Sequence, residues 1–447
     1  MKIVLLAEAC NPDWTSVPLV GFNVVNALSQ RSDLHITLAT HIRNRPALER
    51  QGLANRIEIL WIDNEWITKP LYRMGRLLRG GSSLGWTTNM AFSWPAYVAF
   101  EMAVASRLKR RLKSDEFDLI HRITPVSPTL PSPLSARTTV PMVVGPLNGG
   151  LPWPQEFPEL RSSEREWLSP LRRLYRQLPG FRSTYQHLAG VISGSRHTAT
   201  EIPKYFHGQQ FHLPENGIDP VKFPIASDWT EPAGSFGFIS TGRLVPYKGF
   251  DLILDAMARS SLLRKCRLQI VGDGPQRQNL QEKCCQLGLA ETVNFHGWLP
   301  QPQVAELLSA SQAFVFPSLR EFGGAVVLEA MASGLPAIVM DYGGPAELID
   351  DTTGVRLPMG CRSDVVSHLT AAMESLAGNL ALCRTMARQG IQNVRDLYTW
   401  DRKADALCEI YSTLTHNTVP ARSSSRLSSA QTTGIKHGNP QMHLRPL

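Results

Sequence analysis

The stretch AFVFPSLREFGGAVVLEAMASGLP, from Ala313 to Pro336, holds the transition on which the fold depends. Its first four residues form a short apolar run, typical of a buried strand, which Pro317 ends. Gly323-Gly324 then begin an apolar helical pattern that stops at Gly334. A buried strand, a polar loop and a helix in this order form one unit of a parallel α/β sheet.

Glu329 is the only charged residue inside this apolar helical pattern. Its neighbours three and four positions away are alanine, valine and serine, so no polar face of the helix carries it. A carboxylate in such surroundings is costly unless a group donates hydrogen bonds to it. A second glutamate, Glu321, lies eight residues upstream, across the Gly-Gly pair. The stretch therefore predicts a bound partner that supplies hydrogen-bond donors.

The order of these groups matches the order of groups in a nucleotide sugar. Bare glycine amides at the N-terminus of a helix form an anion-binding site, and here that site lies between the two carboxylates. We predict that Glu321 accepts hydrogen bonds from the sugar and that the region of Gly324 meets the diphosphate. Glu329 would accept hydrogen bonds from the ribose diol. The alternative, two unrelated glutamates, leaves a buried charge without a partner.

A second loop between a predicted strand and a predicted helix carries two cations. In GRLVPYKG, from Gly242 to Gly249, Arg243 and Lys248 lie five residues apart after the apolar run FGFIST. An arginine fork and a mobile lysine ammonium can bind one polyanion together. The alternative is a pair of surface cations.

A third loop, GDGPQR, begins at Gly272 and follows another apolar run. It differs from the dinucleotide fingerprint G-x-G-x-x-G because Arg277 stands at the position of the last glycine. We therefore predict a tight turn near a nucleotide, with Gly272 in the donor site, and no NAD site.

Apolar strand patterns alternate with helical patterns along most of the chain, which predicts parallel sheets covered by helices on both faces. Two such series are present, joined by an aperiodic stretch rich in proline and glycine. We predict an α/β fold of two Rossmann-like domains, residues 1–225 and 232–395, whose parallel sheets face each other across a central cleft. The polar stretch 418–447 is expected to be a disordered tail.

The composition is that of a soluble globular protein, with 43% hydrophobic and 19% charged residues among 447. Seven cysteines without a C-x-x-C pair argue against a disulfide framework and a zinc site. The first apolar run is too short for a signal peptide, and no uncharged apolar run reaches the length of a spanning helix. We therefore expect a cytoplasmic protein.

The net charge of +8 is concentrated in the first half. Residues 1–230 hold 26 Lys and Arg against 19 Asp and Glu, and residues 231–447 hold 20 against 19. Basic runs such as RLKRRLK, Arg107 to Lys113, are typical of solvated helix faces. The alternative is peripheral docking on an anionic membrane at its inner face, or on an acidic acceptor. No nucleic-acid motif accompanies the charge, so no nucleic-acid partner is predicted.

Taken together, these motifs resemble those of a known family. EFGGAVVLEAMASGLP is similar to the E-x7-E motif of retaining glycosyltransferases of the GT-B fold, specifically family 4 (glycosyl transferases group 1). ENGID, GRLVPYKG, VGDGP, HGWLP, GGPAELI and YTWDRKADALCEIY match in the same order and spacing. The resemblance covers about residues 1–415.

The resemblance implies roles for the residues of the second half. Arg243 and Lys248 would hold the donor diphosphate, Glu329 the ribose and Glu321 the transferred sugar. The donor-binding glycines and backbone amides would be those of Gly323, Gly324, Ala325 and Val326.

In the first half the resemblance implies fewer roles. His121, at the end of the run FDLIHR, resembles the active-site histidine that faces the sugar; the alternative is a structural histidine. The first loop of the family carries a Gly-Gly pair at the diphosphate, whereas this chain offers only Gly21. GPLNGG, from Gly145 to Gly150, would line the acceptor side. A helix near 398–415 would cross back onto the first domain.

The implied reaction transfers a sugar from a nucleotide sugar to a glycan or lipid-linked acceptor, with retention of anomeric configuration, in the synthesis of a cell-surface polysaccharide or glycoconjugate. No D-x-D motif occurs, and cationic side chains are already available, so we expect neither a metal nor another cofactor. The alternatives are a GT-B sugar-nucleotide epimerase and a non-catalytic nucleotide-sugar-binding relative.

Overall fold

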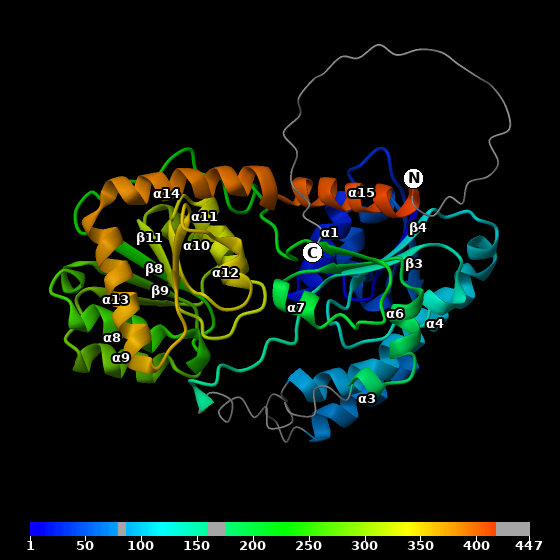
Figure 1. The fold of residues 1–447 in the computed structure, drawn as a ribbon, viewed down its shortest axis with the longest axis horizontal. Coiled ribbons are helices and arrows are strands. Elements are labelled where there is room, and N and C mark those ends of the chain that lie inside the picture. The colour runs from blue at the N-terminus through cyan, green and yellow to red at the C-terminus, as the bar shows by residue number, and fades with distance from the viewer. Residues whose placement is uncertain (79–85, 159–174, 417–447) are drawn as a thin grey trace, which may run out of the picture.

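The computed structural model describes residues 1–78, 86–158 and 175–416, and these form two lobes side by side (Figure 1). Each lobe is built around one sheet, and every strand pairing in both sheets is parallel. The prediction of two Rossmann-like domains is therefore confirmed. The predicted tail 418–447 lies outside the described residues.

The N-terminal lobe has a seven-stranded sheet in the order β3-β2-β1-β4-β5-β6-β7. Its strands are β1 Lys2–Ala7, β2 His35–His41, β3 Glu58–Ile62, β4 Leu119–Thr124, β5 Met142–Leu147, β6 Gly190–Ser193 and β7 Gln209–His212. Its helices are α1 Val17–Leu28, α2 Arg45–Arg50, α3 Glu65–Leu78, α4 Trp86–Lys113, α6 Phe181–His187 and α7 Arg196–Thr200. Separate apolar clusters fill the two faces of the sheet, as expected when helices cover both.

The C-terminal lobe has a six-stranded sheet in the order β10-β9-β8-β11-β12-β13. Its strands are β8 Gly237–Thr241, β9 Arg267–Val271, β10 Val293–Gly297, β11 Ala313–Phe316, β12 Ala337–Met340 and β13 Gly354–Leu357. Its helices are α8 Phe250–Arg259, α9 Arg277–Gln286, α10 Gln301–Ser309, α11 Ala325–Ala332, α12 Gly344–Leu348, α13 Arg362–Gly378 and α14 Leu380–Asn393. The opening stretch of the sequence analysis forms β11, its loop and α11, as predicted.

The chain passes between the lobes at two places that lie side by side. Ile218, on the way to the C-terminal lobe, donates its amide to Tyr398 O at 2.7 Å, and Trp400 N donates to Ile218 O at 3.2 Å. The last helix, α15 (Trp400–His416), then packs against α1 of the N-terminal lobe. Its Leu407 and Tyr411 are buried in the core beneath the first sheet. The N-terminal lobe is thus built from both ends of the described chain.

None of the helices in residues 1–78, 86–158 and 175–416 has the length and apolar character needed to span a bilayer. The basic run predicted to be a solvated face forms the last turns of α4.

Candidate active site

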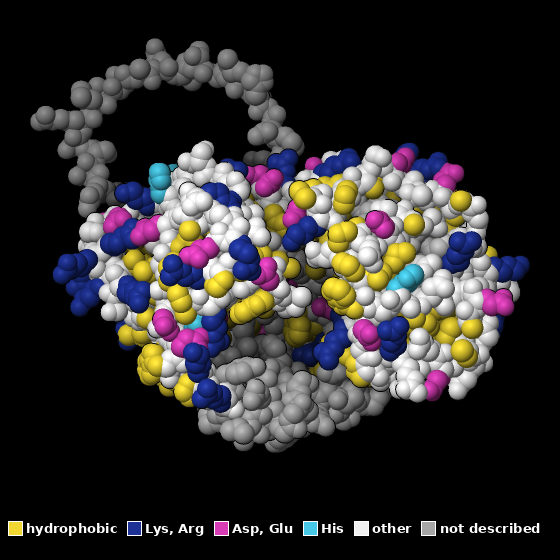
Figure 2. All heavy atoms as spheres, turned by 180° about the vertical axis from the view of Figure 1, so that it is seen from behind, with side chains coloured by type: hydrophobic (Ala, Val, Ile, Leu, Met, Phe, Trp, Pro, Cys, Tyr) yellow, Lys and Arg dark blue, Asp and Glu magenta, His cyan; other side chains and the backbone are white. Residues whose placement is uncertain are grey.

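Both sheets have a point where the strand order reverses, and ligands of such sheets bind outside the carboxyl ends of the strands at that point. In the C-terminal lobe the reversal lies between β8 and β11, which are neighbours. The loop after β8 carries Arg243 and Lys248, and the loop after β11 carries Glu321. The topology therefore brings together two motifs that are far apart in the sequence. Figure 2 shows the opposite face of the molecule, which is hollowed between the lobes.

Lys248 and Glu321 are in contact where the loops after β8 and β11 meet; the space beside these loops is here called the crevice. The lysine ammonium forms an ion pair with Oε2 of the glutamate. The same ammonium lies 4.8 Å from the centre of the Phe316 ring. The two charged side chains are only 13% and 22% exposed, so their attraction is less screened than at an open surface. The structure thus holds a cation and a carboxylate together where a diphosphate and a sugar are predicted.

The N-terminus of α11 is built on glycines. Gly324 has φ +68°, which favours glycine, and a Cβ there would lie 2.9 Å from Pro345 Cγ. A Cβ on Gly323 would lie 2.2 Å from Glu215 Oε1. The amides of Ala325 and Val326, in the first turn, have no acceptor within the helix. The loop can therefore present bare backbone N–H groups to an anion.

Glu329 lies one turn into α11, on a side of the helix that is partly open. Its carboxylate has no hydrogen bond and no ion pair to any of the described residues. Burial raises the pKa of this carboxyl to about 7. The described parts of the chain thus supply no hydrogen-bond donor to the Glu329 carboxylate, and its contact with a ribose stays a prediction.

Arg243 and Gly272 lie on the neighbouring loops of the same crevice. Arg243 is exposed, and its guanidinium has no ion pair with the described residues. Gly272 has φ +133°, and a Cβ there would lie 1.9 Å from Gly242 O. The glycine lets the loops after β8 and β9 approach each other directly, as a tight turn requires. Contact of either residue with a donor stays a prediction.

His121 does not face the crevice. It is fully buried in β4, with Nδ1 2.6 Å from the Tyr411 hydroxyl and Nε2 2.7 Å from Gly145 O. Burial lowers the pKa of its imidazole to about 4. The prediction that His121 faces the sugar is therefore wrong for this structure, and the alternative, a structural histidine, fits. Sequence alone could not separate the two because Tyr411 is 290 residues away.

Gly21 lies in α1 and is buried. A Cβ at this position would lie 2.3 Å from Ala9 O and 3.0 Å from Thr124 Cγ2. The glycine is thus needed for the close approach of α1 to the loop after β1. This packing accounts for the residue without a ligand, and its contact with the donor stays a prediction.

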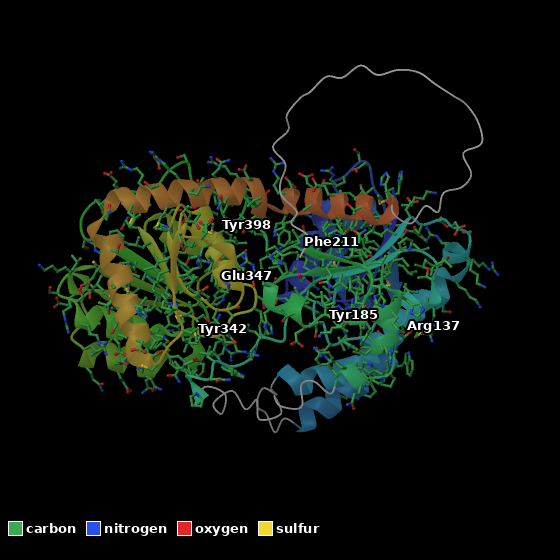
Figure 3. The ribbon with its side chains drawn as sticks, in the orientation of Figure 1. Arg137, Tyr185, Phe211, Tyr342, Glu347 and Tyr398 are labelled. Carbon is green, nitrogen blue, oxygen red and sulfur yellow. The ribbon has the colours of Figure 1, made fainter. Side chains whose placement is uncertain are left out.

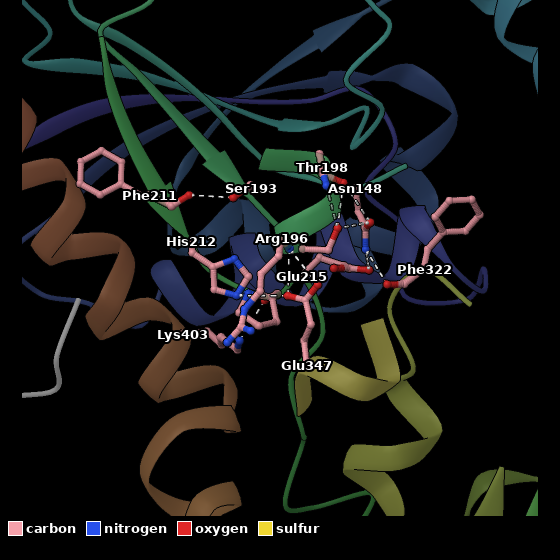
Figure 4. A network of polar contacts seen from close by, with 12 residues as sticks. Asn148, Ser193, Arg196, Thr198, Phe211, His212, Glu215, Phe322, Glu347 and Lys403 are labelled. Atoms are coloured by element: carbon pink, nitrogen blue, oxygen red, sulfur yellow. Dashed lines mark hydrogen bonds and ion pairs between the residues drawn. The ribbon is translucent and has the colours of Figure 1, made fainter. Parts of the chain in front are cut away.

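Two buried polar residues that the predictions omitted join the lobes (Figure 4). Asn148 Nδ2 donates to Glu215 Oε1 at 2.6 Å and to Phe322 O, in the loop after β11, at 3.0 Å. Burial raises the pKa of Glu215. Both residues occur in motifs of the sequence, GPLNGG and ENGID, but their meeting depends on the arrangement of the lobes.

A second contact joins the lobes through Glu347 of α12, on the side of the C-terminal lobe that faces its neighbour (Figure 3). Its carboxylate accepts hydrogen bonds from Arg196 N, at the start of α7, at 2.8 and 2.9 Å. His212 Nε2 lies 3.7 Å from the same carboxylate. Glu347 therefore acts as a cap for α7 supplied by the other lobe.

No grouping of three or more His, Cys, Asp or Glu side chains suited to a metal ion occurs within the part of the chain that the structure describes. The absence of a metal requirement stays a prediction, which rests on the cations of the crevice.

The two parallel-sheet lobes with a crevice between them are the GT-B fold. Sucrose-phosphate synthase from Thermosynechococcus elongatus superposes with a TM-score of 0.63 over 93% of this chain and 100% of that one, at 18% identity. HepE from Anabaena, solved in complex with UDP, gives a TM-score of 0.58 over 92% and 100%, at 17% identity. These likenesses concern the fold.

The family model that matches this chain covers mainly the C-terminal lobe. Residues 223–379 match the family described as Glycosyl transferases group 1. The lipopolysaccharide core biosynthesis glycosyltransferase LpsD of Rhizobium meliloti is 31% identical over 189 residues, 42% of this chain and 53% of the relative. Glycogen synthase of Mycobacterium tuberculosis is 31% identical over 201 residues, 44% and 47% of the two chains. The matches thus span about half the length of these relatives, and they support the group 1 family.

Proposed function

We propose that this protein is a glycosyltransferase that uses a nucleotide-sugar donor. The observation that carries the proposal is Glu329, a half-buried carboxylate to which none of the described residues donates a hydrogen bond. It lies one turn inside a helix whose N-terminus presents bare amides. The ion pair of Lys248 and Glu321 lies beside that N-terminus, in the loops that flank the reversal of strand order. The match of this region to the group 1 family supports the same conclusion.

Each part of the donor would meet a different part of the crevice. Glu329 would accept hydrogen bonds from the two ribose hydroxyls, which supply its missing donors. The N-terminus of α11 and Arg243 would hold the diphosphate. Lys248 would turn toward the phosphate when the donor enters, and Glu321 would then accept hydrogen bonds from the sugar.

The reaction breaks the bond between the anomeric carbon and a diphosphate oxygen and forms a bond between that carbon and an acceptor oxygen. Positive charge develops on the sugar ring and negative charge on the leaving diphosphate. Arg243, Lys248 and the amides of α11 stabilise the leaving group. These groups supply the positive charge, so we propose that the enzyme is metal-independent.

We propose retention of anomeric configuration by attack on the face from which the diphosphate leaves. The acceptor proton passes to the leaving phosphate, so no separate base is required. A double displacement would need a carboxylate nucleophile at the anomeric carbon. Glu321 is assigned to the sugar hydroxyls. His121 is not a carboxylate and is buried with both ring nitrogens hydrogen-bonded, so we assign that role to neither residue.

For the acceptor we propose a glycan or lipid-linked glycan of a cell-surface polysaccharide or glycoconjugate, used at the inner face of the membrane by a cytoplasmic protein in peripheral contact. The basic excess of the N-terminal half supports an anionic surface or acceptor. The role of the relative LpsD in lipopolysaccharide core biosynthesis points the same way.

The test is a calorimetric titration of the purified protein with a panel of UDP-, GDP- and ADP-sugars, without added metal, beside its Glu329→Ala variant. We expect one panel member to bind the wild type and to bind the variant at least tenfold more weakly, because the ribose contact is lost. Equal binding to both proteins would remove Glu329 from the site. Turnover of the bound donor without any acceptor would favour an epimerase. Binding without transfer to any glycan acceptor would favour a non-catalytic relative.

A further inference from the structure

The segment 148–157, here named the strap, belongs to the N-terminal lobe by sequence but lies on the C-terminal lobe. It follows β5, and Figure 1 shows it, in the blue-green of residues near 150, crossing from one lobe to the other. Leu151 and Phe157 are 4% and 3% exposed, and Phe157 is part of the apolar core of the C-terminal lobe. Burial of this size fixes the end of the strap on the opposite lobe.

The strap is attached to the two loops that hold Glu321. Arg320 Nε donates to Leu151 O at 3.1 Å, and the Tyr342 hydroxyl donates to Pro152 O at 2.8 Å. Gly343 is enclosed between the two parts, since a Cβ there would lie 2.3 Å from Glu321 O and 2.8 Å from Leu151 Cδ2. The backbone of Glu321 thus lies close to the strap, with Gly343 between the two.

Arg320 is clamped between aromatic rings. Its guanidinium carbon lies 4.4 Å from the ring centre of Trp153, in the strap, and 5.0 Å from that of Phe322. Arg320 is 8% exposed, so these contacts are made in a largely dry environment, where cation–π attraction is strongest. Trp153 of the strap therefore holds Arg320, and Arg320 in turn packs on Phe322, on the other side of Glu321.

The strap also reaches the loop that carries Lys248. The rings of Trp153 and Tyr247 meet edge to face with centres 5.9 Å apart. The carbonyl of Tyr247 accepts a hydrogen bond from Leu319 N at 2.8 Å, which ties the loop after β8 to the loop after β11. Phe157 lines a cavity of about 290 Å³ beside the same loop, next to Pro246.

We propose that the strap completes the donor site, with Trp153 and Arg320 as positioning residues that hold Glu321 in place for the sugar ring. This proposal rests on the function proposed above. Neither residue touches the reacting atoms; both act through the loops after β8 and β11. Because the strap originates in the N-terminal lobe, recognition of the sugar depends on contact between the lobes.

The proposal predicts a particular pattern of defects. Among the described residues, Arg243 and Glu329, assigned to the diphosphate and ribose, share no hydrogen bond, ion pair or ring contact with the strap. Lys248 is reached through its neighbour Tyr247, and the start of α11 through the bond from Asn148 to Phe322 O. Loss of Trp153, which packs on Arg320 beside Glu321, should therefore weaken binding of the sugar part of the donor more than binding of the nucleotide part. A merely structural role would weaken both equally or lower only the folding stability.

The first experiment needs no ligand. Hydrogen exchange is compared between the wild type, Trp153→Ala and Trp153→Phe at the amides of Leu319 and Gly344, which are bonded to Tyr247 O and Glu321 O. We expect about tenfold faster exchange in Trp153→Ala, because the clamp on Arg320 is lost, and near wild-type exchange in Trp153→Phe, which keeps a ring. Unchanged exchange in Trp153→Ala would overturn the proposal.

The second experiment compares UDP-glucose with UDP, and GDP-mannose with GDP, by calorimetry. For the pair that binds, we expect Trp153→Ala and Arg320→Lys to lose about tenfold in affinity for the nucleotide sugar and less than about twofold for the diphosphate. Arg264→Lys is the matched control, because Arg264 also donates to backbone carbonyls of this lobe, at Ala258 and Leu287, but away from the crevice.

The positioning role would be overturned if Trp153→Ala lost equal affinity for the nucleotide sugar and for the nucleoside diphosphate. It would also be overturned if Arg320→Lys and Arg264→Lys lost equal affinity for the nucleotide sugar. If the wild type bound neither nucleotide sugar, the proposed function would be weakened, and the hydrogen-exchange comparison alone would decide whether the strap orders the two loops. The two proposals can therefore fail separately.

Discussion

The C-terminal crevice and the interior of the N-terminal lobe around His121 and Glu101 differ in how their polar side chains are bonded. In the C-terminal crevice, Arg243 is exposed and Glu329 has no hydrogen-bond partner among the described residues. In the N-terminal lobe, His121 is bonded through both nitrogens. Glu101, also fully buried there, accepts hydrogen bonds from the Tyr97 hydroxyl at 2.5 Å and from Leu134 N at 3.1 Å.

We propose that this difference separates side chains that serve the fold from side chains that a ligand would meet. A buried polar group that is fully bonded stabilises one structure, whereas one left without a partner costs free energy until something binds it. We infer that a buried polar side chain is more reliably assigned to substrate binding by its lack of hydrogen-bond partners in the protein than by the motif in which it lies. Four changes test the contrast, in order of expected effect.

The largest effect is expected for Lys248→Ala. Removal of one preorganised cation from the leaving group should lower kcat by about 10²–10³-fold, the cost found for a single donor to a developing anion. The measurement is steady-state turnover with the donor identified by the panel, beside Lys265→Ala, an exposed lysine of the same lobe outside the crevice. A loss of activity in both variants would point to folding and not to the reaction.

His121→Ala should act on stability and leave donor binding unchanged. It leaves the buried partners Tyr411 and Gly145 O without their hydrogen bonds, which should lower the free energy of unfolding by about 2–3 kcal/mol in urea. Folding lowers the pKa of this histidine to about 4, so its contribution is present above about pH 6.5 and is lost as the pH falls toward 4. The stability difference between wild type and variant should therefore shrink over that range. A large fall in donor affinity in His121→Ala, with unchanged stability, would indicate that His121 belongs to the active site.

Glu329 should make donor binding depend on pH. Its pKa of about 7 means that about a tenth of the carboxyl is ionised at pH 6 and about nine-tenths at pH 8. The ionised form accepts hydrogen bonds from the ribose, so nucleotide-sugar affinity should rise about ninefold between these pH values. Glu329→Gln should bind with little pH dependence.

The stability of the free protein should change in the opposite direction. A carboxyl whose pKa is raised by folding destabilises the native state as the pH rises from about 4.5 through 7. Glu329→Gln should therefore unfold at a higher temperature than the wild type at pH 8, while it binds the donor less well. A lower melting temperature for Glu329→Gln than for the wild type would indicate that Glu329 has a partner within the protein. The contrast with His121 would then be wrong.

Arg243→Lys should have the smallest effect, about threefold to fivefold in donor affinity, because the charge is kept and only the fork of donors is lost. Calorimetry with the nucleotide sugar and with its diphosphate should show the same loss for both. A loss of affinity for the nucleotide sugar alone would indicate that Arg243 contacts the sugar and not the diphosphate.

The sequence predicted the loops of the C-terminal crevice because they are made from short contiguous motifs. Glu321 and Glu329 share one stretch, and the loops after β8 and β11 follow directly from the strand pattern. That these loops lie side by side follows from the rule that the carboxyl ends of parallel strands meet at one edge. The ion pair of Lys248 with Glu321 was not predicted, because the two residues were assigned to different parts of the donor.

The sequence failed where the meaning of a residue depends on a distant one. His121 is structural because Tyr411 packs on it from the far end of the chain, and the strap matters because Trp153 reaches Arg320 in the other lobe. Tyr411 lies in the motif YTWDRKADALCEIY, which predicts a helix that returns to the first domain, but the motif does not show which buried residue Tyr411 meets. Trp153 leaves no periodic or local signal, because its contact with Arg320 depends on how the lobes meet.

The return of α15 to the first lobe has a consequence for the order of folding during synthesis. Leu407, Ile410 and Tyr411 complete the core beneath the seven-stranded sheet, yet they leave the ribosome after every strand of the six-stranded sheet has been made. Domains usually fold in the order in which they are synthesised. Here the lobe that is translated first lacks these core residues, and His121 lacks its Tyr411 partner, until the lobe translated second has been made.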